Sequence, residues 1–288
     1  MNTSLKKTLC ICLLGSLILG SALSAGEWKS LYVFGDSYSD SGAGYVDGNG
    51  PTAVVYLARG LGIPFTYATD ADRAGKGLNF AVSGGQSGVG EGRLRSCQSC
   101  GEGPKLLGRG VLTQVEDFVG RVNSGEIKVS SGDTLFFIAA GLNDRNLSTE
   151  TTVANLKQGI RELYGVGARH ILIASLPTRI PQFSEVGLRL NPALCKIPEE
   201  LDLPGLDLRL SNWGQFFDEV MENAGSYGFI NTTDACAGRA LFDQNTTPQG
   251  DPETYYFYHE GHPSTAVHRI VGKKLLQEIN AICRPGAG

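Results

Sequence analysis

The chain has 288 residues, with 25 lysines and arginines against 29 aspartates and glutamates, which gives a formal net charge of −4. This acidic balance argues against a nucleic-acid partner, because proteins that bind phosphate backbones present a basic patch. The sequence contains no repeat, linker or low-complexity tract, and a chain of this length can bury a full-sized core.

The N-terminal stretch MNTSLKKTLCICLLGSLILGSALSAGEW has the layout of a secretory signal peptide. Lys6 and Lys7 precede an apolar run from Leu9 to about Leu19, and small residues follow that run. A membrane-spanning helix needs about 20 apolar residues, so an uncleaved anchor is the weaker interpretation. We expect residues 1–25 to be removed and the protein to be secreted or periplasmic. Without them the chain has 23 basic and 29 acidic residues, and its formal net charge is −6.

The remaining residues, 26–288, are expected to form one domain in which strands alternate with helices. Four apolar runs predict buried strands: SLYVFG ending near Gly35, DTLFFIAAG ending near Gly141, RHILIASLP ending near Pro177, and a weaker YGFINT near 227–232. Helical spacing of apolar residues occurs in four sets: Val115, Phe118, Val119 and Val122; Val153, Leu156, Ile160 and Leu163; Leu210, Trp213, Phe216, Phe217 and Val220; and Val267, Ile270, Val271, Leu275, Ile279 and Ile282. This alternation predicts an α/β fold with a mostly parallel sheet covered on both faces.

Polar residues that directly follow the strands are the candidates for chemistry, because open parallel sheets bind ligands beyond the carboxyl ends of their strands. Ser37 follows the first strand, and its hydroxyl becomes nucleophilic only if a neighbouring imidazole takes its proton. His170 begins a strand at the opposite edge, and His268 lies within the last helix. The base is therefore expected to be His259 or His262, in the loop YYFYHEGHPST that enters this helix.

Acyl transfer also requires hydrogen-bond donors for the oxyanion that develops during the reaction. Asn143 lies just past the end of the second strand, in AAGLND. The turn LNFAVSGGQSG offers an unpaired main-chain N–H at Gly84 or Gly85. Each of these features is common in loops, so neither is specific when taken alone.

Four motifs follow one another along the chain: FGDSYSD, NFAVSGG, GLND and HPS. In this order and spacing they resemble the four blocks of the SGNH or GDSL hydrolase family, and the resemblance covers essentially the whole mature chain. It implies a three-layer, flavodoxin-like α/β/α sandwich, in agreement with the strands and helices. It also implies Ser37 as nucleophile and oxyanion donor through its own N–H, Gly84 as a main-chain donor, Asn143 as a side-chain donor, and His262 as general base.

The sequence departs from this family at the residue that orients the base. Family members usually carry Asp three residues before the catalytic His, where it accepts the Nδ1 proton and fixes the tautomer. Here His259 occupies that position, and Glu260 is the only acid in the loop, so we take Glu260 as the expected catalytic acid. Two other sources remain open: a backbone carbonyl in a Ser–His dyad, or a remote acid such as Asp251 or Glu253.

The resemblance implies a secreted serine esterase or lipase that hydrolyses carboxylic esters through an acyl-enzyme on Ser37. The expected substrates are lipid, lysophospholipid or short-chain acyl esters, with transient contact to a membrane surface. The alternatives are an acyltransferase that uses the same serine, a carbohydrate acetylesterase, and a non-catalytic binding module. No cofactor or metal is expected, because the mechanism needs only side chains and water and no ligands occur at metal-site spacing.

Five cysteines follow the predicted signal peptide: Cys97, Cys100, Cys195, Cys236 and Cys283. In an exported protein we expect cysteines to be disulfide partners, and the odd number leaves one of them over. We interpret SCQSC as a clasp within a loop rather than as a redox or zinc motif, because it follows a Gly- and Arg-rich stretch and no second such pair exists.

Overall fold

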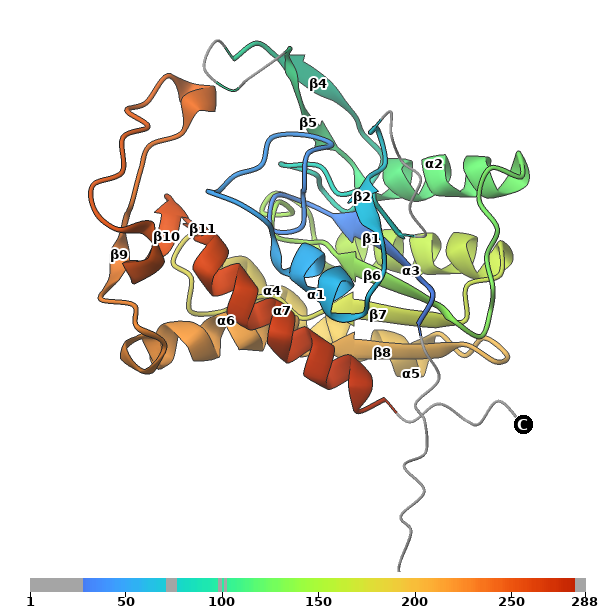
Figure 1. Cartoon of the computed structure of the whole chain (residues 1–288). Coiled ribbons are helices and arrows are strands. Elements are labelled where there is room, and N and C mark those ends of the chain that lie inside the picture. Colours follow the sequence, from blue (N-terminus) through green and yellow to red (C-terminus); the bar gives the residue numbers. More distant parts are fainter. Residues whose placement is uncertain (1–27, 71–76, 98–99, 101–102, 283–288) are drawn as a thin grey trace, which may run out of the picture.

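A six-stranded parallel sheet forms the centre of the protein, as the computed structural model in Figure 1 shows. The structure describes residues 28–70, 77–97, 100 and 103–282, so the predicted signal peptide lies outside the described residues. In spatial order the strands are β2 (Phe65–Tyr67), β3 (Gly77–Asn79), β1 (Ser30–Gly35), β6 (Thr134–Ala139), β7 (His170–Ala174) and β8 (Asp207–Ser211). Every neighbouring pair is parallel.

Helices cover both faces of this sheet (Figure 1). The helices that pack together on one side are α1 (Ala53–Gly60), α6 (Trp213–Glu222) and α7 (Thr265–Asn280). Those that pack together on the other are α2 (Val111–Asn123), α3 (Thr149–Gly165) and α4 (Ser184–Leu194), and a short α5 (Ile197–Glu200) precedes β8. The predicted three-layer α/β/α sandwich with a parallel sheet is thereby confirmed.

The two central strands are the most deeply buried, which explains why their sequences are continuous apolar runs. They pair in register from Ser30 with Thr134 to Gly35 with Ala139. Gly35 is required at the end of β1, because a Cβ atom there would lie 2.5 Å from the main-chain oxygen of Ala139. This close approach brings the chain that follows β1 to the centre of the sheet's carboxyl edge.

Two sequence predictions for the C-terminal half need correction. The stretch near 227–232 does not join the central sheet; it ends the 3₁₀ helix Ala224–Tyr227 and begins β9 (Asn231–Ala235), a strand of a separate small sheet. The sixth central strand is β8, which contains Leu210, a residue whose spacing had suggested a helix. In β8, apolar Leu208 and Leu210 alternate with polar residues, and the strand ends at Ser211. Helix α6 therefore begins later than predicted, at Trp213.

The small sheet places the C-terminal motif at the end of the sandwich. It consists of β9, β10 (Tyr255–His259) and β11 (His262–Pro263). Immediately afterwards α7 begins, capped by the side chain of Ser264, which accepts a hydrogen bond from the Val267 N–H. The 3₁₀ helices Ala240–Phe242 and Pro252–Thr254 lie in the connection between β9 and β10.

The Gly-rich segment after the second motif forms an antiparallel hairpin of β4 (Glu91–Arg95) and β5 (Lys105–Arg109). Cys97 and Cys100 form a disulfide near the tip of this hairpin, as expected for a loop clasp. The expected pairing of the other cysteines is wrong for Cys195 and Cys236, which are free thiols; Cys283 lies outside the described residues. None of the described helices is long and apolar enough to span a membrane.

Candidate active site

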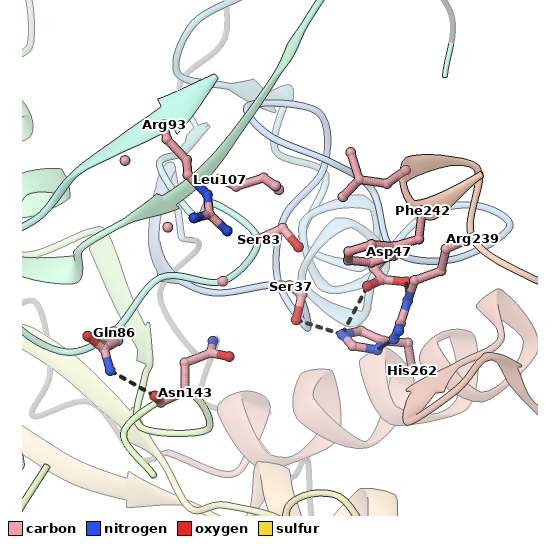
Figure 2. A pocket seen from close by; sticks show the side chains of 14 residues that line it. Ser37, Asp47, Ser83, Gln86, Arg93, Leu107, Asn143, Arg239, Phe242 and His262 are labelled. Carbon is pink, nitrogen blue, oxygen red and sulfur yellow. Dashed lines mark hydrogen bonds and ion pairs between the residues drawn. The ribbon is translucent and has the colours of Figure 1, made fainter. Parts of the chain in front are cut away.

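The structure brings Ser37 and His262 into direct contact although they are 225 positions apart in the sequence. The Ser37 Oγ lies 2.8 Å from the His262 Nε2, and both residues are buried (Figure 2). Ser37 comes from the turn after β1, and His262 opens β11, which directly precedes α7. A hydroxyl donating to an imidazole nitrogen is the arrangement in which a serine can lose its proton during attack.

The turn that carries Ser37 is held by its own backbone and by buried side chains. The N–H groups of Ser39 and Asp40 both donate to the main-chain oxygen of Asp36, which closes the turn around Ser37. The Gln114 side chain accepts from the Gly35 N–H at 2.9 Å and donates to the Gly35 carbonyl at 2.8 Å. Such paired contacts fix the end of β1 on α2, so Ser37 is presented by a rigid support.

The Nδ1 side of His262 faces a main-chain carbonyl and a guanidinium. The Nδ1 atom lies 3.1 Å from the Glu260 carbonyl oxygen and 2.6 Å from Nη2 of Arg239. These two partners favour opposite tautomers, because a carbonyl can only accept a proton and a guanidinium can only donate one. When Ser37 donates to Nε2, Nδ1 carries the proton and donates it to the Glu260 carbonyl. In this tautomer Arg239 Nη2 cannot donate to Nδ1, and it donates to the same Glu260 carbonyl instead.

Glu260 contributes to the site through its backbone rather than through its carboxylate. Its side chain is exposed and accepts from the Gln182 amide at 3.5 Å, so the expected role of Glu260 as the catalytic acid needs correction. The two remote acids do not reach His262 either. Asp251 caps the 3₁₀ helix by accepting from the Glu253 N–H, and Glu253 forms an ion pair with Arg269.

Asp47 is the carboxylate of this site, and the sequence analysis did not identify it. Its Oδ2 lies 3.4 Å from the His262 Nε2, and its Oδ1 lies 2.7 Å from Nδ1 of His259 and 2.9 Å from Nε of Arg239. It lies in the loop DSGAGYVDGNGP between β1 and α1, 212 positions from His259. The available signal was an isolated acid in a Gly-rich loop that follows the nucleophile motif.

The charges around His262 set the protonation states that the site needs. Burial is the main cause that lowers the pKa of His262; Asp47 opposes this effect, and Arg239 adds to it. Burial raises the pKa of Asp47, but His262, His259 and Arg239 outweigh it and bring the pKa to about 2. Near neutral pH the imidazole is therefore neutral and able to accept a proton, beside a carboxylate that stays ionised.

The predicted oxyanion donors line the same cavity as Ser37. Gly84 has φ +79°, and neither its N–H nor that of Ser37 has an acceptor among the described residues. The neighbouring Gly85 N–H already donates to Val82, which favours Gly84 as the donor. The Asn143 side-chain nitrogen donates to the Gly85 carbonyl at 3.0 Å, and its second N–H remains for a ligand.

Buried Asp40 connects the turn that carries Ser37 to the turn that carries Gly84. One carboxylate oxygen accepts from the N–H groups of Gly42 and Gly44, and the other accepts from the Ser83 N–H at 2.8 Å. Burial raises the pKa of Asp40 to about 6, and these main-chain bonds limit the rise. Because Ser83 directly precedes Gly84, Asp40 fixes the position of Gly84 relative to Ser37.

These residues lie at one end of a cavity of about 560 Å³, a size typical of small-molecule sites. Its walls come from the β4–β5 hairpin and from the segment that contains the 3₁₀ helix Ala240–Phe242. Leu107 and Arg93 belong to the first wall, and Leu241 and Phe242 to the second. The described residues contain no group of His, Cys, Asp and Glu side chains that could hold a metal ion.

Known proteins share sequence and fold with this chain. A GDSL esterase/lipase of Arabidopsis thaliana is 24% identical over 146 residues, covering 42% of this chain and 42% of the relative. A thermolabile hemolysin of Vibrio parahaemolyticus is 24% identical over 213 residues, covering 63% of this chain and 50% of the relative. The matched regions thus span about half the length of these curated relatives.

Solved structures include a member of the lipolytic G-D-S-L family from Veillonella parvula, with 12% identity and a TM-score of 0.47 over 88% of this chain and 100% of that one. An acetylxylan esterase from Geobacillus stearothermophilus has 15% identity and a TM-score of 0.46, over 88% of this chain and 95% of that one. The family model described as GDSL-like Lipase/Acylhydrolase matches residues 31–275. Because this match spans most of the chain, the protein belongs to the GDSL-like lipase/acylhydrolase family.

Proposed function

We propose that the protein is an exported carboxylic ester hydrolase that works through an acyl-enzyme on Ser37. The observation that carries this proposal is the 2.8 Å contact between Ser37 Oγ and His262 Nε2 at a cavity lined by Gly84 and Asn143. The proposed nucleophile, base and oxyanion donors line one cavity, which supports acyl transfer as the reaction. The Cys97–Cys100 disulfide supports export, because disulfides persist in oxidising compartments.

In the proposed first step, the Ser37 Oγ attacks the ester carbonyl carbon while its proton moves to Nε2 of His262. The N–H groups of Ser37 and Gly84 and the Asn143 amide hold the oxyanion. Collapse of this intermediate breaks the bond to the alcohol oxygen, which takes the proton from Nε2 and leaves. A water molecule then attacks the acyl-enzyme, its proton passes to His262, and Ser37 recovers its proton as the carboxylic acid departs.

Orientation of His262 rests on the Glu260 carbonyl, so the proposed catalytic pair is a dyad with Asp47 as a charged neighbour. Asp47 lies close to Nε2, where the positive charge of the imidazolium is partly located in the transition state. Its ionised carboxylate can therefore stabilise that charge without holding the Nδ1 proton. Arg239 neutralises part of this effect, because it pairs with Asp47 at 2.9 Å.

The cavity favours small or single-chain esters over the interior of a polymer. The Arg95 guanidinium lies 4.6 Å from the Phe242 ring, a contact that joins the hairpin to the opposite wall of the cavity. Leu94, beside the cavity on β4, and Phe242, in its opposite wall, are 69% and 45% exposed, and these apolar side chains support transient contact with a lipid surface. Lipid, lysophospholipid and short-chain acyl esters are therefore proposed ahead of acetylated polysaccharide.

Hydrolysis of a chain-length series of p-nitrophenyl esters tests this proposal. We expect release of nitrophenol with formation of an equal amount of carboxylic acid, and an optimum at short or medium chain length. Addition of an alcohol acceptor distinguishes the alternative, an acyltransferase: a new ester in place of the acid would contradict hydrolysis as the main reaction. If none of the esters reacted, hydrolysis and acyl transfer would both be contradicted, and a non-catalytic binding module would be the remaining function.

Replacement of Asp47 with asparagine should lower kcat and shift the pH profile. We expect kcat to fall about tenfold to hundredfold, since the imidazolium loses a charged neighbour. The Asp47 carboxylate opposes the lowered pKa of His262, so its removal lowers that pKa further. The acidic limb of kcat/KM should therefore move to lower pH in Asp47→Asn.

The matched control for Asp47→Asn is Asp202→Asn, which removes a carboxylate from an exposed position. This control should keep the wild-type profile. An acidic limb that stays in place or moves to higher pH in Asp47→Asn would show that Asp47 does not act on His262.

A further inference from the structure

One positive charge in the cavity has no partner in the part of the chain that the structure describes. The charged residues that line the cavity are Asp47, Arg93 and Arg239, and the first and last of these form an ion pair. The Arg93 side chain has no hydrogen-bond, ion-pair or ring partner among the described residues. With His262 neutral, the cavity therefore carries one net positive charge in a protein whose overall charge is negative.

Neighbouring arginines show that Arg93 differs from its surroundings. On the same strand, Arg95 lies over the Phe242 ring, and across the hairpin Arg109 pairs with both Glu91 and Asp117. Strand β4 holds Arg93 opposite Leu107 on β5, so the backbone of Arg93 is fixed by the hairpin ladder. Figure 2 shows its guanidinium directed into the cavity, toward Ser83 and Ser37.

The geometry around Ser37 indicates which part of an ester would meet this charge. In the proposed reaction His262 protonates the departing alcohol, so the alcohol part must lie on the His262 side of Ser37. Figure 2 places Arg93 on the other side of Ser37 from His262, and places Phe242 above His262. The acyl part of the ester therefore extends toward Arg93, while its alcohol part lies toward the wall that contains Leu241 and Phe242.

We propose that Arg93 is a specificity-determining residue that selects esters whose acyl part carries a negative charge and whose alcohol part is apolar. The chemical class is the monoester of a dicarboxylic acid, in which the free carboxylate accepts hydrogen bonds from the planar guanidinium. This inference rests on the proposed function, since the orientation of the ester follows from the roles of Ser37 and His262. Among the substrate classes proposed above, this inference favours acyl esters over lysophospholipids, because a lysophospholipid carries its negative charge on the alcohol part. Recognition of such an anionic alcohol part is the rival explanation for the charge in the cavity.

Three esters of equal acyl length test the inference: monophenyl adipate, neutral phenyl hexanoate, and meta-carboxyphenyl hexanoate, which carries its charge on the alcohol part. Binding to the Ser37→Ala variant by calorimetry measures recognition without turnover, and hydrolysis by the wild type measures kcat/KM. We expect the adipate to bind about tenfold more tightly than phenyl hexanoate, as one charge-assisted hydrogen bond in a partly wet site provides. Added salt should weaken this preference.

Variants of Arg93 assign the preference to this side chain. In Arg93→Gln the ratio of kcat/KM for adipate over phenyl hexanoate should fall to about one, and Arg93→Lys should restore part of it, because a point charge replaces the guanidinium fork. Arg93 and Arg161 are both exposed, but Arg161 lies on α3 and does not line the cavity, so the control Arg161→Gln removes the same charge and should keep the wild-type ratio.

The outcomes separate this inference from the proposed function. Equal binding of adipate and phenyl hexanoate to Ser37→Ala would overturn the role of Arg93, whatever the turnover. A preference for meta-carboxyphenyl hexanoate would also overturn it, because the charge would then be recognised on the alcohol side. Tighter binding of adipate without hydrolysis by the wild type would support the anion site and contradict the ester hydrolase.

Discussion

Ser37→Ala should lose about 10⁴- to 10⁶-fold in kcat toward p-nitrophenyl butyrate, with little change in stability. The reason is that no other hydroxyl lies in contact with His262 among the described residues, so no substitute nucleophile can form the acyl-enzyme. Serine hydrolases lose activity on this scale when the nucleophile is removed, and the remaining rate comes from binding and the oxyanion donors. Initial rates and thermal unfolding of both proteins check this prediction.

Ser226→Ala is the matched control for this experiment, because it removes the same hydroxyl from an exposed 3₁₀ helix. It should hydrolyse the ester at the wild-type rate. If Ser37→Ala kept more than about a tenth of the wild-type kcat, the acyl-enzyme mechanism on Ser37 would be wrong, since that residual rate exceeds what binding and the oxyanion donors provide.

His262→Ala should lose about 10⁴-fold in kcat, because the Ser37 hydroxyl then has no base within hydrogen-bond distance. Labelling by a fluorophosphonate, which reports an activated serine, should slow by a similar factor. This second measurement separates loss of the base from loss of the nucleophile, since the serine itself is still present. Activity and labelling are both measured near neutral pH, where His262 is neutral in the wild type.

The control for the histidine is His170→Gln, on the far side of the sheet. His170 opens β7 and lies 3.6 Å from Asp207, at the end of the strand opposite the cavity. Its replacement should leave kcat unchanged. Rapid fluorophosphonate labelling of His262→Ala would contradict the assignment of His262 as the base.

The parts of the site that could be predicted are those that directly follow strands or precede a helix. Gly84 was predicted from its glycine-rich turn and from the resemblance to the family, because β3 is too short to be predicted. Ser37 and Asn143 follow β1 and β6, two predicted strands that are neighbours in the sheet. Their proximity follows from parallel topology, because parallel strands end at the same edge. The position just before the last helix limited the base to His259 or His262, and the resemblance to the family selected His262.

Asp47 and Arg239 could not be predicted, because their positions depend on loops. Each lies in a segment without hydrophobic periodicity, and the pair is 192 positions apart in the sequence. Loop conformation depends on contacts with the finished fold, so the local sequence does not show which residues Asp47 and Arg239 contact. Arg93 could not be predicted for the same reason, because its hairpin forms from a Gly-rich stretch whose sequence predicts a loop.

The short strands of the sheet were missed for a different reason. Strands β2 and β3 have three residues each, too few to show a period, and they gain their hydrogen bonds from the finished sheet. In β8 the residues Leu208 and Leu210 alternate with polar residues, but Leu210 also fits the helical spacing that starts at Trp213. Tertiary pairing with β7 decided between the two patterns.

The central claim, that Ser37 forms a covalent acyl-enzyme, is tested most directly by mass spectrometry of the protein quenched in acid during turnover of a p-nitrophenyl ester. We predict an increase in intact mass equal to one acyl group, located by peptide mapping on Ser37 and absent from Ser37→Ala. An adduct on another residue, or an adduct that persists in Ser37→Ala, would contradict the account.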